Sequence, residues 1–463
     1  MIFSSLLFIF WFIPIFFGIY YIVPARFKNV VLFGGSILFY AWGEPRYLIL
    51  IGISILVNYI GGIFIEKFEN KALWRKITLI VTLAFDFGML GVFKYTNFFI
   101  ENINSLIGGL TGGSGPLSAV DITLPLGISF YTFQIASYVI DLYRGRIKCE
   151  HNLLNLGTYL VMFPQLIAGP IVVYSQVSCE LKNRRASLED VEDGIATFIL
   201  GLGSKVLIAN NVGALWDDIG AIGYENASMG LCWLGVLAYT LQIFFDFNGY
   251  SLMAIGLGKM MGFNIPKNFD FPYISLSITE FWRRWHMTLS GWFREYVYIP
   301  LGGNRKGPAK TYVNLFIVWF LTGFWHGAGW NFIFWGLFFF IILVLEKQFL
   351  KDFLASHRIF ARIYSLLLIG LSWMIFAITD IREMGVFFAR LVSFDFDTDV
   401  LYYLRNYGII CILGCVLSTP ALVGVYNRYK RKPLGVAVLL MILFISVCCL
   451  ADASYNPFLY FRF

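Results

Sequence analysis

Long apolar runs alternate with short polar segments along almost the whole chain. Residues 48–65, 229–247 and 434–450 are examples that carry almost no charge. A helix needs about 20 mostly apolar residues to cross a bilayer. Because such runs recur from one end of the chain to the other, the pattern predicts an all-α polytopic membrane protein.

Charge changes this picture only by orienting the predicted helices. The 463 residues are 59% hydrophobic and 14% charged, whereas soluble domains carry about 25% charged residues. The net charge of +7 comes from basic residues in short loops, where positive charge marks the cytoplasmic side. We therefore expect these basic residues to lie at the surface of the lipid bilayer, and we expect no binding of nucleic acid.

The loop charges predict about 10 or 11 crossings of the membrane. Residues 2–23 are interpreted as a retained first span, because no basic stretch or small-residue cleavage site accompanies them. The Gly/Ser-rich stretch 97–120 and the acid-rich stretch 380–399 are expected as outer loops. Both termini are then predicted to be extracytoplasmic.

Two apolar segments have basic residues on both sides, so a full crossing would violate the charge rule. They are residues 156–173, which contain Pro and Gly, and residues 312–345. Irregular backbone at membrane depth is tolerated where protein or a cavity surrounds it. We interpret both segments as re-entrant hairpins that open a central funnel or tunnel from the cytoplasm.

The second hairpin holds the most informative residue of the chain. His326 is followed by Gly327 and lies between two apolar runs. Ionisable side chains at membrane depth are costly and usually functional. His326 is therefore a candidate catalytic residue, although a neutral histidine packed between helices would also fit the pattern.

A polar stretch at residues 277–300 contains a second histidine, His286. Helical spacing predicts one amphipathic helix with Trp282, Trp285, Trp292 and Phe293 on its apolar side. Arg283 and Arg284 could then hold lipid head groups or a phosphorylated ligand. His286 could also be an ordinary packed histidine.

Several other residues are weaker candidates. Asn304 lies in a Gly-rich turn that could cradle an anion. Asp246 is an acid in an apolar run, and Gln134 begins a polar line along one helical face; both are expected to support the site rather than react. His151 and His357 are interpreted as loop histidines. The seven cysteines show no paired metal spacing, so we expect no disulfide and no metal.

Seven motifs in order give the chain a family resemblance. They lie at residues 124–134, 163–170, 245–250, 281–286, 298–305, 324–328 and 455–463. Together they resemble the membrane-bound O-acyltransferase family, in the branch that O-acetylates alginate, peptidoglycan and other cell-envelope polysaccharides. The family's intramembrane histidine falls on His326, and a second, more branch-specific histidine falls on His286. Residues 1–463 would form one domain, with N-terminal spans at 1–120, the core at 121–350 and C-terminal spans with an aromatic tail at 351–463.

The resemblance implies acetyl-CoA as a cytoplasmic acyl donor and transfer towards the outer face. His326 would act as general base. His286 or Asn304 would polarise the thioester carbonyl or position the donor, with Arg283, Arg284 and Trp285 near its nucleotide end. In a sister branch a small separate protein supplies a similar aromatic end, whose tyrosine is proposed to carry the acyl group. Here Tyr460 would supply it, although an aromatic anchor for the last span is an equally simple interpretation.

The resemblance also implies partners and a location. A Ser-His-Asp arrangement for the final transfer is not evident in the sequence, so we expect a separate extracytoplasmic transferase of the serine-hydrolase type and a polysaccharide acceptor. The expected location is the bacterial cytoplasmic (inner) membrane. Two alternatives stay open: transfer of another acyl group, such as D-alanine, to teichoic acid or a lipid, and a polytopic transporter with a polar tunnel.

Overall fold

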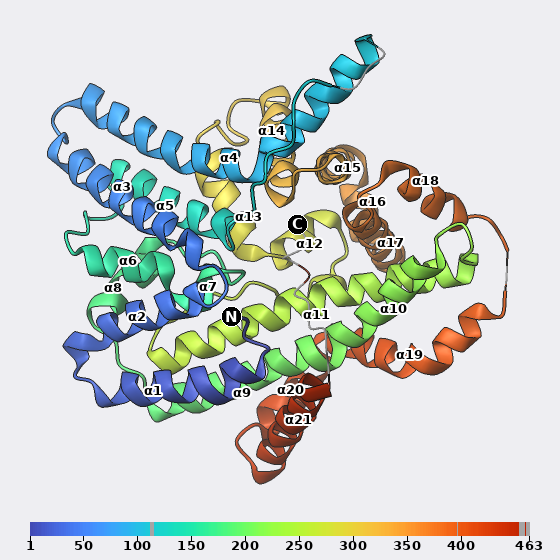
Figure 1. Ribbon diagram of the computed structural model, residues 1–463. Helices are drawn as coiled ribbons and strands as arrows, with labels where there is room; N and C mark the ends of the chain where they lie inside the picture. The colour runs from blue at the N-terminus through green and yellow to red at the C-terminus, as the bar shows by residue number, and fades with distance from the viewer. Residues whose placement is uncertain (112–114, 396, 453–458, 460–463) are drawn as a thin grey trace. The chain divides into compact units, whose positions relative to one another are not determined.

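A computed structural model describes residues 1–111, 115–395, 397–452 and 459. Every regular element within these residues is a helix (Figure 1). The chain divides into two compact units. The first comprises Met1–Ile2, Leu7–Val191 and Gly258–Ile265, and the second Phe3–Leu6, Glu192–Leu257 and the described part of Pro266–Phe463.

The first unit contains the N-terminal helices. Their bounds are α1 (Ile13–Ile22), α2 (Lys28–Ala41), α3 (Leu48–Lys67), α4 (Ala72–Thr111), α5 (Ile128–Tyr143), α6 (Leu153–Val161), α7 (Phe163–Leu166) and α8 (Tyr174–Lys182). Helices α3, α4 and α5 pack on one another, and α2 packs on α6 (Figure 1).

The ring of Phe163, at the start of α7, is a centre of this packing. It lies 5.1 Å from the ring of Phe16, 5.3 Å from that of Phe12 and 5.6 Å from that of Phe39. Pro164 in the next position fixes a backbone angle suited to the start of a helix. The segment at 156–173 thus forms two short helices, α6 and α7, neither of which is long enough to cross a bilayer.

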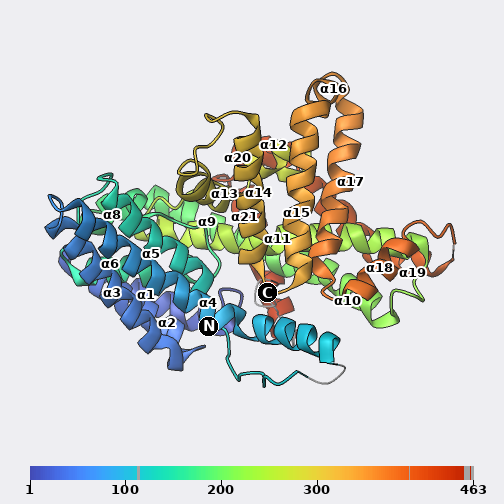
Figure 2. The ribbon, with the colours of Figure 1, turned by 90° about the horizontal axis from the view of Figure 1, so that it is seen from above.

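The second unit contains the remaining helices. Their bounds are α9 (Leu188–Gly203, from residue 192 onward in this unit), α10 (Asn210–Ile222), α11 (Met229–Met261, to residue 257 in this unit), α12 (Ile278–Arg284), α13 (Met287–Phe293), α14 (Pro308–His326), α15 (Trp330–Leu345), α16 (Lys351–Ser356), α17 (Arg358–Ala377), α18 (Ile381–Arg390), α19 (Asp399–Leu417), α20 (Val423–Tyr429) and α21 (Pro433–Asp452). Helices α14 and α15 form an antiparallel pair, and α17 packs beside α15 (Figure 2).

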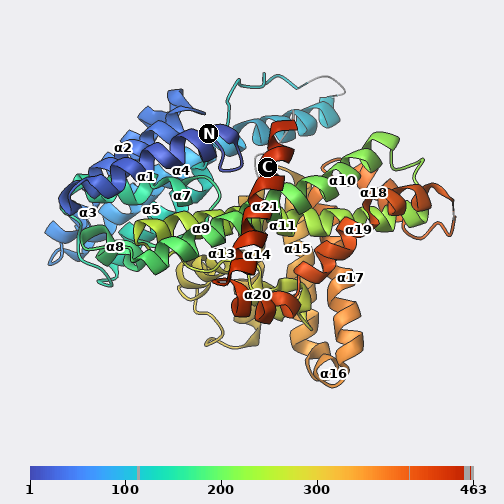
Figure 3. The same cartoon turned by 90° about the horizontal axis from the view of Figure 1, so that it is seen from below.

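Short π-helical and 3₁₀ segments join these helices. The π segments are η1 (Phe8–Phe12), η4 (Ser204–Ala209), η6 (Arg294–Tyr298) and η7 (Glu346–Leu350), and the 3₁₀ turns are η2 (Ala25–Phe27), η3 (Pro45–Tyr47), η5 (Pro272–Ile274) and η8 (Pro420–Leu422). The η4 segment makes α9 and α10 one continuous helix. Helix α21 packs against η4, and α19 against α10 (Figure 3).

Eight helices in the described part of the chain are long and apolar enough to span a membrane. The polytopic, all-α prediction is confirmed, but the expected count of about 10 or 11 is higher than these eight. The difference arises at the N-terminus and around α5. Helix α2 has 14 residues, α5 has 16, and the first apolar run is divided between η1 and α1.

Three predicted segments differ in detail from the structure. Residues 97–111, expected in an outer loop, continue α4, which is 40 residues long. The predicted amphipathic helix at 277–300 is divided into α12, α13 and η6, and its aromatic face is buried in protein. The hairpin around His326 has longer arms than expected, because α14 has 19 residues and the second arm, Trp330–Ser356, has 27.

Candidate active site

His326 is the last residue of α14, and its side chain is buried. The imidazole lies between aromatic rings from two other helices. Its centroid is 5.0 Å from the ring of Trp335 on α15 and 5.2 Å from that of Phe376 on α17, both in edge-on geometry. Aromatic rings on two sides pack against the buried imidazole and fix the plane of its ring.

Two glycines allow α14 and α15 to pack closely enough to form this pocket. A Cβ atom on Gly323 would lie 2.3 Å from the carbonyl oxygen of Phe332, and one on Gly336 would lie 2.4 Å from that of Trp319. Small residues permit the backbones of membrane helices to approach in this way. The close approach places Trp335 against His326.

His286 lies at the break between α12 and α13 and is 1% exposed. Its backbone has a φ of 43°, in the left-handed region that residues other than glycine rarely adopt. The imidazole meets the ring of Phe247 edge-on at 4.7 Å. The Trp325 ring contacts both histidines, with centroids 6.3 Å from His286 and 4.9 Å from His326. The structure thus brings the two predicted histidines to one aromatic cluster.

Asn268 determines how His286 is protonated. Its Oδ1 accepts hydrogen bonds from the backbone N–H of Thr288 at 3.3 Å and from the Thr288 hydroxyl at 2.9 Å. The same oxygen lies 3.1 Å from Nδ1 of His286. An amide oxygen can only accept, so Nδ1 of His286 carries the proton and Nε2 carries the lone pair. Burial lowers the pKa of His286 to about 3, which keeps the imidazole neutral.

A pocket of about 630 Å³ begins at the N-terminus of α12. Its basic lining residues are Arg283, Lys347 and Lys351, and its polar ones include Ser277, Thr279 and Tyr298. Glu346 also lines it, but both its carboxylate oxygens are engaged in capping α12. They accept the backbone N–H groups of Ile278 at 2.6 Å and Thr279 at 2.9 Å. Three basic side chains face one carboxylate in this lining, and this excess of positive charge favours an anionic ligand.

The arginines predicted to hold phosphate differ in their surroundings. Arg283 is exposed and lines this pocket. Arg284 is paired with Glu280 at 2.9 Å and with Asp270 at 3.2 Å. Arg283 is therefore the better placed of the two for a ligand.

The other predicted residues are distributed more widely. Trp285 is buried, and its ring lies 4.8 Å from that of Trp373. Asn304 lies in an exposed turn before α14. Gln134 is buried on α5 in the first unit, whereas both histidines belong to the second. Tyr460 lies outside the described residues.

Asp246 accepts a hydrogen bond from Leu459, the residue of the C-terminal tail that the structure describes. Its Oδ1 lies 2.6 Å from Nζ of Lys205, and both side chains are buried. Its Oδ2 accepts the backbone N–H of Leu459 at 2.7 Å, and Leu459 is itself buried. Asp246 is predicted to support the site rather than react, and in the structure its carboxylate satisfies two buried donors, Lys205 and Leu459.

Sequence reasoning missed Asn268, Lys205 and Glu346. Asn268 is one polar residue in a polar stretch, so no pattern marks it. Lys205 and Glu346 each interrupt or end an apolar run, and a charge in that position is a signal of a buried partner. The identity of the partner requires the fold.

Comparison with known proteins identifies the family of the chain. Residues 147–380 match the model of MBOAT, the membrane-bound O-acyltransferase family. The chain is 36% identical over 491 residues to the probable alginate O-acetylase AlgI of Pseudomonas putida, with 100% of both chains covered. The chain belongs to the membrane-bound O-acyltransferase family. The resemblance drawn from the motifs is confirmed.

Two further relatives show the range of the family's activities. The peptidoglycan O-acetyltransferase of Helicobacter pylori is 36% identical over 81% of this chain and 77% of its own. The teichoic acid D-alanyltransferase of Streptococcus thermophilus is 28% identical over 67% of this chain and 84% of its own. Family membership and the candidate spans make the protein a multi-pass membrane acyltransferase.

Proposed function

We propose that the protein takes acetyl groups from cytoplasmic acetyl-CoA and passes them across the membrane for O-acetylation of an extracytoplasmic polysaccharide. The two buried histidines that contact Trp325 carry this proposal, because a dry aromatic pocket with two imidazoles suits proton transfer from a hydroxyl. The relatives named for alginate and peptidoglycan O-acetylation support acetyl as the group and a cell-envelope polysaccharide as the acceptor.

The donor would bind from the pocket lined by Arg283, Lys347 and Lys351. A coenzyme A nucleotide carries several phosphate charges, and arginine binds such groups with two parallel hydrogen bonds. The pocket volume lies in the usual range for small-molecule sites. Arg284, Trp285 and Asn304 would then support the site rather than contact the phosphates.

In the transfer step His326 acts as general base. It takes the proton of the attacking hydroxyl, the oxygen forms a bond to the thioester carbon, and the carbon–sulfur bond breaks. The thiolate of coenzyme A leaves and takes up the proton held by His326, which returns the imidazole to its neutral form. His286 contributes as an acceptor at Nε2, since its Nδ1 proton is donated to Asn268. It would orient the donor or the hydroxyl rather than polarise the carbonyl.

Trp335 is the better candidate for polarising the carbonyl. Its side chain is fully buried, and its indole N–H has no hydrogen-bond partner among the described residues. A buried donor left unpaired costs free energy, so it usually has a purpose. The ring lies 5.0 Å from that of His326. The indole N–H would stabilise the negative charge that develops on the thioester oxygen.

The acyl group would next reach an acceptor on the outer side. Tyr460 is the acceptor in the chain, and Asp246 would hold the tail near the site through the adjacent Leu459. A separate extracytoplasmic transferase of the serine-hydrolase type would complete the transfer. In this proposal the protein lies in the bacterial inner membrane with both termini outside.

The test measures release of free coenzyme A thiol from acetyl-CoA by the purified protein in detergent, with mass spectrometry of the C-terminal peptide. His326→Ala is expected to abolish thiol release while the protein still folds. Acetylation at Tyr460 would support the relay, and release without a modified peptide would remove the relay alone. If the wild type releases no thiol even with the partner and the polysaccharide present, the proposal is overturned. Assays of D-alanyl transfer and of transport would then distinguish the two alternatives.

Trp335→Phe is the sharper variant in the same assay, because it keeps the ring and removes only the N–H. We expect kcat to fall by about 10²- to 10³-fold, the usual effect of losing one such donor, with KM nearly unchanged. Trp330→Phe, on the same helix and half exposed, is the matched control. An unchanged kcat in Trp335→Phe would exclude this donor role.

A further inference from the structure

A cysteine, a histidine and a glutamate converge in the first unit, in a place that the acyltransfer does not use. Glu66 lies in the last turn of α3, and Cys149 and His151 lie in the link between α5 and α6. One ligand atom from each of the three residues lies within 4.8 Å of the other two. Nε2 of His151 is 3.1 Å from Oε2 of Glu66.

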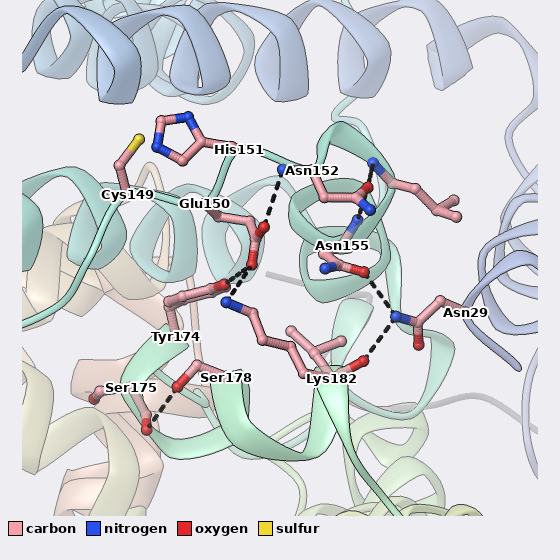
Figure 4. Close-up of polar contacts among 12 residues, drawn as sticks. Asn29, Cys149, Glu150, His151, Asn152, Asn155, Tyr174, Ser175, Ser178 and Lys182 are labelled. Carbon is pink, nitrogen blue, oxygen red and sulfur yellow. Dashed lines mark hydrogen bonds and ion pairs between the residues drawn. The ribbon is translucent and has the colours of Figure 1, made fainter. Parts of the chain in front are cut away.

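The backbone of the link explains how two of these side chains come together. Residues 149–151 form no helix, and alternate side chains along an extended segment point to opposite sides. Cys149 and His151 therefore share one side, and Glu150 points to the other (Figure 4). A cysteine and a histidine two residues apart are thus presented together towards the end of α3.

Glu150 fixes the link from the opposite side. Its carboxylate accepts hydrogen bonds from the Tyr174 hydroxyl at 2.6 Å and from the backbone N–H of Asn152 at 2.9 Å, and it lies 3.4 Å from Nζ of Lys182 (Figure 4). Glu150 is fully engaged there, so it is not a candidate ligand. These contacts hold residues 149–151 in the extended conformation that places Cys149 and His151 on the same side.

Two tyrosines hold the link further. The Tyr59 hydroxyl donates to the backbone carbonyl of His151 at 2.8 Å. The Tyr138 hydroxyl accepts the backbone N–H of Glu150 at 3.1 Å and lies 3.8 Å from Sγ of Cys149. Such outer contacts orient ligands and are a regular part of metal sites.

We propose that Cys149, His151 and Glu66 bind one Zn²⁺ ion, with water in the fourth position. Thiolate, imidazole and carboxylate are the three protein ligands that zinc prefers, and the thiolate argues against Ca²⁺ and Mg²⁺. Metal–ligand bonds of about 2.0–2.3 Å in a tetrahedron separate the ligand atoms by roughly 3.3–3.7 Å. Binding releases the proton of the Cys149 thiol to solvent.

Two of the three ligands have room to adjust to this geometry. The His151 and Glu66 side chains are 66% and 44% exposed, so both can rotate towards an ion. Cys149 is buried and held, so it provides the fixed point of the site. An ordinary exposed ion pair between Glu66 and His151 would be worth about 0–1 kcal/mol and would not involve the cysteine.

The ion would join the end of α3 to the link between α5 and α6. Because this role concerns the assembly of the first unit, it is independent of acyl transfer and of the proposed function. The sequence pattern predicts no metal, because the cysteines show no paired metal spacing, and Glu66 is 83 positions before Cys149.

The experiment uses the full-length protein in detergent, with any affinity tag removed, and Co²⁺ as the probe. Thiolate ligation of Co²⁺ gives a charge-transfer absorption band that carboxylate and imidazole alone do not give. We expect the band to saturate at one ion per chain and Zn²⁺ to displace it. Cys149→Ser should abolish the band. His151→Gln should weaken binding more than 100-fold, since losing even an outer partner costs about 10- to 100-fold.

Two variants serve as matched controls. Cys179→Ser removes an exposed cysteine of the same unit, and His357→Gln removes an exposed histidine elsewhere. Both should bind Co²⁺ like the wild type. A band of equal strength in Cys149→Ser, or no band in the wild type, would overturn the proposal. If Cys149→Ser fails to fold, His151→Gln decides the question, because Co²⁺ binding as tight as in the wild type would overturn the proposal.

Discussion

The two histidines of the site are buried residues whose roles depend on their neighbours. Their position in apolar or aromatic sequence is enough to predict that they matter, because ionisable groups are rare in such surroundings. Their chemistry is not predictable from sequence. The protonation of His286 depends on Asn268, 18 residues earlier, and the pocket of His326 depends on Trp335 and Phe376 from other helices.

The buried state of His286 predicts how stability depends on pH. Burial lowers its pKa to about 3 in the folded protein, whereas an unfolded histidine has a pKa of about 6.5. Between these values the unfolded chain takes up a proton that the folded protein does not. Stability is therefore expected to fall as pH drops below about 6.5, by up to about 1.4 kcal/mol per pH unit from this group.

Thermal unfolding in detergent at several pH values measures this effect. His286→Gln should be less stable than the wild type at neutral pH, because it loses the contact with Asn268. The gap in melting temperature should shrink as pH falls, since only the wild type has this histidine to protonate. His357→Gln, at an exposed position, is the control for the loss of a histidine elsewhere in the protein. Parallel curves for His286→Gln and the wild type would contradict the expected pKa.

At the scale of elements, apolar periodicity locates most helices but not their breaks. The aromatic spacing at 277–300 predicts one helix, yet the chain turns at His286, where φ is 43°. The hydrogen bonds of Asn268 to Thr288 and of Glu346 to the start of α12 offset that strained angle. These partners are distant in sequence, so local propensity does not reveal them. Residues 97–111, expected as part of a loop, are by contrast the last part of helix α4.

The packing of α14 on α15 gives the prediction at this scale. Gly323→Ala would place a Cβ atom 2.3 Å from the Phe332 carbonyl oxygen, and the backbone would have to move. We expect a loss of about 3 kcal/mol or more of stability, at the upper end of overpacking effects, together with loss of thiol release.

Gly385→Ala is the matched control, because Gly385 lies within α18, is exposed and has nothing within 4 Å of the added atom. It should gain about 0.5–1 kcal/mol from helix propensity. Melting temperature and size-exclusion profiles measure both variants. If the Gly323→Ala protein is as stable and active as the Gly385→Ala protein, the close packing of α14 on α15 is not required.

At the scale of the whole molecule, the sequence predicts the all-α fold class, the family and the membrane character. It does not predict which residues distant in sequence pair with one another. Asp246 and Lys205 lie on separate apolar helices, and Leu459 is 213 positions after Asp246. A buried charge signals that a partner exists. Only the fold shows that one carboxylate satisfies both the lysine and the backbone N–H of Leu459.

This pairing predicts that the tail can be released without unfolding the protein. Removing one charge alone would leave the other buried and cost about 3–5 kcal/mol, so both are changed together. Lys205→Met with Asp246→Asn keeps an amide oxygen for the Leu459 N–H, whereas Lys205→Met with Asp246→Leu removes it. We expect both double variants to fold, since apolar replacement of a buried ion pair is often neutral.

The two double variants should differ only in what happens at the tail. Carboxypeptidase should trim the Asp246→Leu form faster, and this form should still release thiol from acetyl-CoA while transferring less acetyl to the tail or to the polysaccharide. The Asp246→Asn form should behave like the wild type in both assays. Because the pair differs by the acceptor of one hydrogen bond, equal trimming and equal transfer in the two forms would mean that Asp246 does not hold the tail. Faster trimming with undiminished transfer would mean that it holds the tail but that acyl transfer does not depend on the tail being held.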